Sequence, residues 1–93
     1  MLLAIVAAIA CLLAVPAGAS AAIVNLTSFA TTASGSITAY PCGGAIPVPS
    51  NVNAVAGSTV SNLAIVPVTG DHRICLSSKA ATHLLVDLQG WIL

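Results

Sequence analysis

The residues best suited to acid-base chemistry are His83 and Asp87, which accompany sixteen serines and threonines between residues 20 and 93. A serine hydrolase needs a nucleophilic hydroxyl, a histidine and a carboxylate in direct hydrogen-bond contact. His83 and Asp87 lie four residues apart in a segment typical of a β-strand, so their Cα atoms are roughly 13 Å apart. The sequence also has no Gly-x-Ser-x-Gly motif to present a serine on a sharp turn. We therefore expect no enzymatic activity and no catalytic residues.

Metal-binding patterns are also missing from the sequence. The available ligands, His72, His83, Asp71 and Asp87, do not show the spacing of zinc ligands. A calcium loop needs several clustered carboxylates, and the two aspartates are dispersed. Asp71 and His72 follow Gly70 in a segment typical of a tight turn. We expect neither a metal nor a cofactor.

The candidate ligand contacts are Tyr40 and Trp91, the two aromatic residues that also carry a polar group. If the two rings are exposed together with the amides of Asn51, Asn53 and Asn62, they could stack on a neutral sugar. If they are buried, the same rings would fix the ends of the core. This is expected in a domain so poor in aromatic residues, since Phe29 is the third and last of them. The sequence leaves both interpretations open.

Charge is nearly absent from the chain. Only four of its 93 residues are charged, and the formal net charge is zero. Two cations cannot neutralise several phosphates, which excludes nucleic-acid partners and recognition of anionic membranes. Intrinsic disorder is excluded as well, because 58% of the residues are hydrophobic. The composition predicts a single small, neutral, folded domain.

The N-terminal segment is typical of an export signal. Fourteen apolar residues, Leu2 to Val15, precede the small residues from Pro16 to Ala21. The run is shorter than the roughly 20 residues of a membrane-spanning helix, so a permanent anchor is not favoured. We predict a signal peptide over residues 1–19 and a secreted domain over residues 20–93. A misassigned start or a truncated chain is the alternative, because no lysine or arginine precedes the apolar run.

Two cysteines, Cys42 and Cys75, lie beyond the predicted signal peptide. A small domain in an oxidising compartment commonly needs a covalent link, so the pair predicts a disulfide. With 32 residues between the cysteines, the loop-entropy model gives about 3 to 4 kcal/mol of stabilisation. Two free thiols are the alternative, and a metal site is disfavoured because neither cysteine has a second ligand nearby.

Apolar and β-branched runs separated by Gly, Pro, Ser and Asn predict an all-β domain. Leu84, Val86 and Leu88 should share one face of the last strand. The run 59–68 is apolar on both faces from Leu63 onward, which is expected of a central strand. The architecture predicted is a small antiparallel β-sandwich or partly closed barrel. The expected strands cover residues 22–27, 36–40, 51–55, 59–68, 73–77 and 82–88.

Six segments, which together cover most of the secreted region, carry a resemblance to a known family: residues 16–27, 35–43, 49–53, 57–63, 74–76 and 82–91. In these segments the chain resembles the β-repeat modules of unknown function found in actinobacterial extracellular and cell-wall-associated proteins. The resemblance implies a Cys42–Cys75 disulfide and a place beside other extracellular domains, and it implies no activity. The family's upstream strand is replaced here by the apolar leader, so the chain is either a module without its first strand or a fragment.

These observations predict a non-enzymatic, secreted or cell-wall-associated module that acts by adhesion or by weak binding of neutral glycan or protein. The alternative is a structural module that self-associates through its sheet edges, because uncharged strands invite pairing with a neighbour. A hydrolase is a distant third. In every case we expect contacts made by hydroxyl, amide and apolar groups, because the chain lacks the charge for electrostatic steering.

Overall fold

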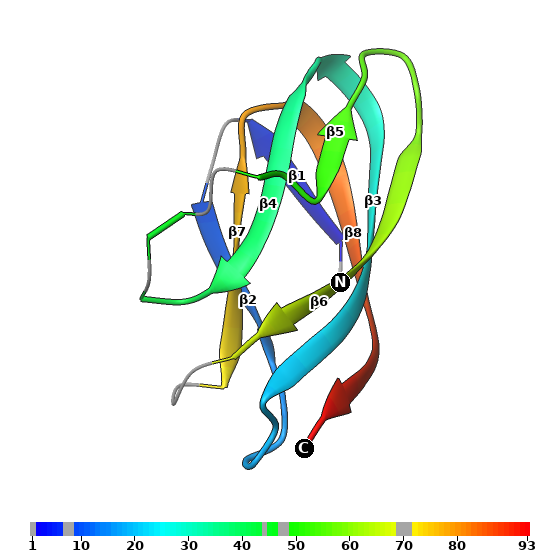
Figure 1. Cartoon of the computed structure of the whole chain (residues 1–93). Helices are drawn as coiled ribbons and strands as arrows, with labels where there is room; N and C mark the ends of the chain where they lie inside the picture. Colours follow the sequence, from blue (N-terminus) through cyan, green and yellow to red (C-terminus); the bar gives the residue numbers. More distant parts are fainter. Residues whose placement is uncertain (1, 7–8, 44, 47–48, 69–71) are drawn as a thin grey trace.

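The computed structural model describes residues 2–6, 9–43, 45–46, 49–68 and 72–93, with side chains from Val15 onward. These residues form two four-stranded antiparallel sheets that face each other (Figure 1). Sheet A has the order β1 (Leu2–Val6), β8 (Ala81–Ile92), β3 (Ala21–Ala33) and β6 (Val60–Pro67). Sheet B has the order β2 (Ile9–Ala14), β7 (Arg73–Ser78), β4 (Gly35–Pro41) and β5 (Val52–Ala54). The predicted all-β sandwich is confirmed, and the two sheets do not close into a barrel.

The core lies between the two sheets and is built by alternation along the strands. In β3 the even-numbered residues from Ala22 to Ser28 point inward and are fully buried. The opposing layer is supplied by β4 and β7 of sheet B. The largest buried apolar side chains are Val24, Leu26, Ile37, Val66, Ile74, Leu76, Leu84 and Val86. Aliphatic packing therefore stabilises the sandwich.

The expectation of a central strand at residues 59–68 is wrong. This segment is β6, which lies at the edge of sheet A and pairs only with β3 among the described strands. Ala64 and Val66 face the core, while Leu63 and Ile65 are 57% and 59% exposed. The local sequence is apolar on both faces, but only one face is covered by sheet B.

The alternation expected in the last strand is confirmed. Leu84 and Val86 are buried, and Leu88 is on the same face but only partly covered. The strand is longer than predicted, because it continues past Gln89 and Gly90 to Ile92. Gly90 pairs with Ile23 while Leu88 pairs with Val24, so Gln89 is the extra residue of a β-bulge. The strand therefore passes through the bulge and does not end there.

Residues 1–19, the predicted signal peptide, contain two strands in this structure. β1 pairs with β8 over Leu2↔Leu85 to Val6↔Ala81, and β2 pairs with β7. The same apolar run that suits a signal peptide also suits strands at the margins of two sheets. The structure shows how these residues pair when they are attached, and cleavage after Ala19 stays a prediction.

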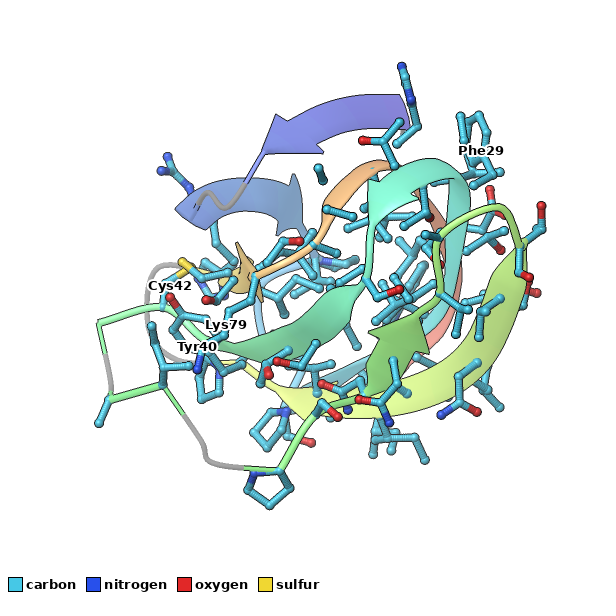
Figure 2. The ribbon with its side chains drawn as sticks, turned by 90° about the horizontal axis from the view of Figure 1, so that it is seen from above. Phe29, Tyr40, Cys42 and Lys79 are labelled. Atoms are coloured by element: carbon cyan, nitrogen blue, oxygen red, sulfur yellow. A yellow bond between two sulfur atoms is a disulfide. The ribbon has the colours of Figure 1, made fainter. Side chains whose placement is uncertain are left out.

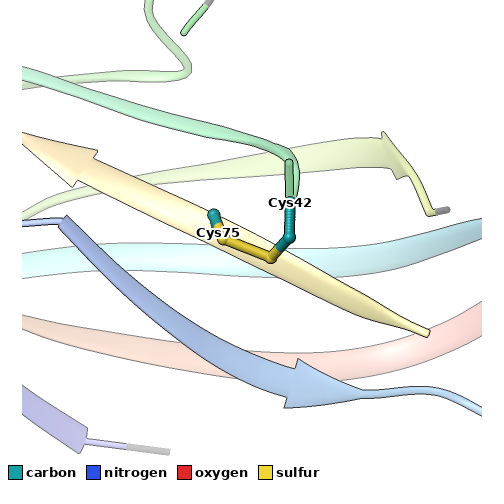
Figure 3. The surroundings of a disulfide bond; sticks show 2 residues. All are labelled: Cys42 and Cys75. Carbon is teal, nitrogen blue, oxygen red and sulfur yellow. A yellow bond between two sulfur atoms is a disulfide. The ribbon is translucent and has the colours of Figure 1, made fainter. Parts of the chain in front are cut away.

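The disulfide between Cys42 and Cys75 is confirmed, with a Cα–Cα distance of 5.1 Å (Figure 3). Cys75 lies in the middle of β7, and Cys42 lies in the turn that follows β4. Tyr40 is the β4 partner of Cys75, and the three side chains form a small buried cluster. The bond therefore fastens the end of β4 to β7. Of the turn expected at residues 69–72, only His72 is among the described residues, and its φ is 58°.

Gly35 is required where β3 turns into β4. A Cβ atom at this position would lie 2.5 Å from the backbone oxygen of Lys79 and 2.8 Å from the nitrogen of Ala80. Gly35→Ala is therefore expected to lower the free energy of unfolding by about 1 to 3 kcal/mol, because backbone atoms must move apart. Urea denaturation measures this loss. Gly90→Ala is the matched control, since its Cβ would meet only Ile23 Cδ1 at 3.9 Å. Equal stability of the two variants would contradict the tight packing at Gly35.

Candidate functional site

Tyr40 and Trp91, the two candidate stacking residues, have different environments. Tyr40 is 5% exposed and packs in the disulfide cluster on the outer side of sheet B. Figure 2 shows it next to Cys42, with Phe29 far away on the other side of the molecule. Trp91 is 47% exposed near the end of β8 in sheet A. The core role proposed for aromatic residues thus applies to Tyr40, whereas Trp91 keeps an accessible ring.

The candidate amides lie at the other end of the sandwich. Asn53 pairs with Ser36, just after the β3–β4 turn, whereas Trp91 pairs with Ala22 at the start of β3. Asn53 is exposed and its Oδ1 accepts a hydrogen bond from Ser50 Oγ. The structure therefore does not bring Tyr40, Trp91 and the amides together, and the four residues form no common sugar platform.

Asn51 and Asn62 instead connect the two sheets along their β5 and β6 edges. The backbone N–H of Ala39 donates to Asn51 Oδ1 at 2.7 Å, and Asn62 Nδ2 donates to the Asn51 carbonyl at 2.8 Å. Asn62 Oδ1 also accepts from the N–H of Leu63 at 3.1 Å. These bonds satisfy backbone groups that no neighbouring strand reaches. The amides expected to contact a ligand thus have a structural role at Asn51 and Asn62.

Asn51→Ala is expected to lower the free energy of unfolding by about 1 to 3 kcal/mol, because the N–H of the buried residue Ala39 loses its partner. Asn53→Ala is the matched control, because Asn53 is an exposed amide two residues away. Its cost should stay within about 0.5 kcal/mol. Chemical denaturation compares the two variants, and similar midpoints would contradict the bridging role of Asn51.

The hydroxyl groups of Thr31 and Thr82, the latter adjacent to His83 in sequence, are also structural. Thr31 Oγ1 and Thr82 Oγ1 are buried and 2.8 Å apart, and Thr82 Oγ1 donates to the carbonyl of Phe29 at 3.0 Å. They sit beside an irregularity in β3 where Ala30 has a φ of 50°. His83 lies on the opposite, outer face and stacks on Phe29 with ring centroids 5.5 Å apart. These hydroxyls therefore stabilise the irregular segment of β3.

Asp87 pairs with Asn25 on the outer face of sheet A, four residues along β8 from His83. Within residues 2–6, 9–43, 45–46, 49–68 and 72–93, no three His, Cys, Asp or Glu residues are grouped as metal ligands. The same described ranges contain no helix long and apolar enough to cross a membrane. The acid-base residues singled out in the sequence are thus distributed along a sheet surface.

The clearest surface feature was not predicted from the sequence. An apolar face lies on the outer side of sheet A, at the end of the sheet where β3 begins and where β6 and β8 end. We define the apolar face as Ile23, Leu63, Ile65, Pro67 and Ile92. Ile23 pairs with Ile65, and Ala21 pairs with both Pro67 and Ile92, so register places these residues side by side. Leu63, Ile65 and Ile92 are well exposed. Pro67, which cannot donate a hydrogen bond to a neighbouring strand, was the sequence signal that this strand lies at an edge.

A strip of polar groups borders the apolar face. Asn25 Nδ2 donates to Thr27 Oγ1 at 3.4 Å, and Thr27 Oγ1 is 2.9 Å from Ser61 Oγ. Asp87 lies next to Asn25 on the same side of sheet A. The surface therefore combines exposed aliphatic side chains with hydroxyl and amide groups. Such a combination suits an uncharged partner.

Comparisons with models of known protein families, with curated protein sequences and with solved structures give no significant match. The function must therefore be argued from the geometry of the chain itself.

Proposed function

We propose that the chain is a non-enzymatic binding module of the cell envelope that contacts neutral glycan or protein through the apolar face. The single observation that supports this proposal is the exposure of Leu63 and Ile65, at 57% and 59%, beside hydroxyl and amide groups. Exposed apolar clusters with polar borders are typical of interaction surfaces. Trp91 does not belong to the apolar face, because it pairs with the inward-pointing Ala22 and so lies on the opposite side of sheet A.

The export of the chain is part of the same proposal. The Cys42–Cys75 disulfide is compatible with an oxidising, extracellular compartment. The apolar N-terminal run and the small residues after it support recognition by an export pathway. N-terminal sequencing of material recovered outside the cell would test the export and the cleavage site together.

Binding should be insensitive to salt, because hydroxyl, amide and apolar contacts are not screened by ions. Retention of the folded chain on purified cell-wall glycan, or on extracted wall protein, should persist across a salt series. Ile65→Ser should weaken it about tenfold or more, because a buried isoleucine contributes about 1.5 to 3 kcal/mol. The matched control is Val55→Ser, another exposed aliphatic residue, which lies outside the apolar face.

Two results would contradict the proposed function. One is equal weakening by Ile65→Ser and Val55→Ser, and the other is an absence of retention at every salt concentration. In the binding assay each variant is first compared with the wild type by circular dichroism, so that an unfolded variant is not scored as a lost contact.

Self-association is the second candidate, and the exposure of Leu63 and Ile65 on an edge strand favours it. The β6 edge is partly blocked, since the N–H of Leu63 is bonded to Asn62 and Pro67 has no N–H. A second copy would therefore dock on the apolar face itself. Sedimentation that depends on concentration, together with no affinity for wall material, would replace the first candidate with this one.

A further inference from the structure

β8 has a strand on both sides over its first half and on one side over its second half. β1 pairs with β8 from Ala81 to Leu85, whereas β3 pairs with it as far as Ile92. For residues 87–92, β3 is the only strand that pairs with β8 in the part of the chain that the structure describes. Figure 1 shows β1 beside the upper part of β8, with the end of β8 continuing below it. We define residues 87–92 as the β8 edge.

The β8 edge lacks the proline and the inward-pointing charge that commonly protect an edge strand from pairing. Residues 87–92 contain no proline, lysine or arginine. Their one charged residue, Asp87, pairs with Asn25 on the outer side of sheet A. The edge strand β6, in contrast, ends at Pro67 and has the N–H of Leu63 already bonded. The β8 edge is therefore more open to an incoming strand than the β6 edge is.

Two apolar side chains beside the β8 edge point inward and are nevertheless exposed. Leu88 pairs with the buried residue Val24, and Trp91 pairs with the buried residue Ala22, so both point to the inner side of sheet A. They share this side, although they are three residues apart, because Gln89 is the extra residue of the bulge. Leu88 is 36% exposed and Trp91 is 47% exposed, whereas the inward-pointing residues earlier in β8 are buried. Apolar surface on the inner side is thus left uncovered where β1 no longer accompanies β8.

We propose that the β8 edge binds an extended segment of another polypeptide, which joins sheet A as a strand antiparallel to β8. β1 shows what β8 accepts, since it is an apolar strand that pairs antiparallel over the adjoining residues. The added strand continues the row of β1 and bonds to the backbone groups of β8 that point away from β3.

The side chains along the β8 edge define the chemistry of the partner. Side chains of the added strand alternate between the two sides of the sheet. Apolar ones cover Leu88 and Trp91 on the inner side, and small hydroxyl-bearing ones lie near Asp87 and Gly90 on the outer side. The partner is therefore an uncharged segment with alternating apolar and hydroxyl side chains. This contact uses the inner side of sheet A, whereas the apolar face lies on the outer side. Removal of residues 1–19 would lengthen the β8 edge to Ala81 and leave the site in place.

The test uses the full chain and a short capped peptide of alternating valine and threonine. N-methyl groups on alternate residues keep the peptide from associating with itself and leave the N–H donors on its other side intact. Amide hydrogen exchange followed by NMR should slow, when the peptide is added, at those amides of residues 87–92 that point away from β3. The control peptide is methylated at every residue, so it has no donors and should leave the exchange unchanged.

Trp91→Lys should weaken binding of the peptide about tenfold or more, because the added strand would have to bury a charge on the inner side of sheet A. Val55→Lys is the matched control, because Val55 is 49% exposed, as Trp91 is 47% exposed, and lies outside the β8 edge. Circular dichroism first compares both variants with the wild type. The exchange measurement uses the wild type and keeps the proposal testable if Trp91→Lys does not fold.

Unchanged exchange in residues 87–92, equal binding of the fully methylated peptide, or equal weakening by the two lysine substitutions would overturn the proposal. Slowing of the same amides that depends on protein concentration, with no peptide present, would also overturn it and would assign the β8 edge to a second copy. Retention of Ile65→Ser on wall material reports on the apolar face, so failure at one site is distinguished from failure at the other.

Discussion

Cys75→Ser is expected to lower the free energy of unfolding by about 2 to 5 kcal/mol, as is typical when a small domain loses its disulfide. Cys75 is bonded to Cys42 across a separation of 33 residues, and it also belongs to the buried cluster with Tyr40. Its loss frees a long segment of the unfolded chain and loosens the turn after β4. Urea denaturation of the oxidised wild type and of the variant measures the difference.

Reduction and alkylation of the wild type provide the control for Cys75→Ser. That treatment removes the disulfide without changing the sequence, so it should produce a loss of similar size. A Cys75→Ser variant as stable as the oxidised wild type would show that the disulfide does not hold the fold together.

Leu26→Ala is expected to cost about 2 to 5 kcal/mol, because it leaves a cavity in a core that cannot collapse freely. Leu26 is fully buried in the central part of sheet A, between Asn62 of β6 and Val86 of β8. Leu63→Ala makes the same chemical change on the outer face of the same sheet, at a side chain that is 57% exposed. Its cost should be within about 0.5 kcal/mol.

Denaturant midpoints and slopes give the free energy of unfolding of the two leucine variants. Because both variants carry the same Leu→Ala change, any difference between them reports the burial of the side chain. A loss confined to Leu26→Ala agrees with the packing described for the sandwich. Equal losses would mean that the outer face is covered in solution, which would place Leu63 in an interface. The same measurement at several protein concentrations identifies a second copy as the cover, because association makes stability depend on concentration.

The strands of this chain could be predicted because residues that face the core alternate, one by one, with residues that face outward, and this alternation is visible in the local sequence. Leu84 and Val86 alternate with His83 and Leu85, and the structure buries the first pair more than the second. The order of strands in a sheet depends on contacts between distant residues, which no local pattern describes. Leu63 and Ile65 therefore suggested a buried strand, although β6 lies at an edge.

The candidate site was harder to predict than the fold. Tyr40 and Trp91 have similar chemistry, and only their neighbours separate them: Tyr40 packs against the disulfide, while Trp91 lies beyond the bulge at Gln89 near the end of β8. An amide that binds a sugar and an amide that completes a backbone hydrogen bond also look the same in a sequence. Asn51 was assigned the first role, and its bond to Ala39 gives it the second.

The hydrogen bonds of Asn62 have a consequence for solubility. A protein with four charged residues among 93 cannot rely on electrostatic repulsion to keep its copies apart in concentrated solution. The exposed backbone of an edge strand is the usual template for cross-β growth. Asn62 occupies the N–H of Leu63, and Pro67 offers no N–H where β6 ends. At these two positions β6 withholds donors from an incoming strand, and this local protection does not depend on charge.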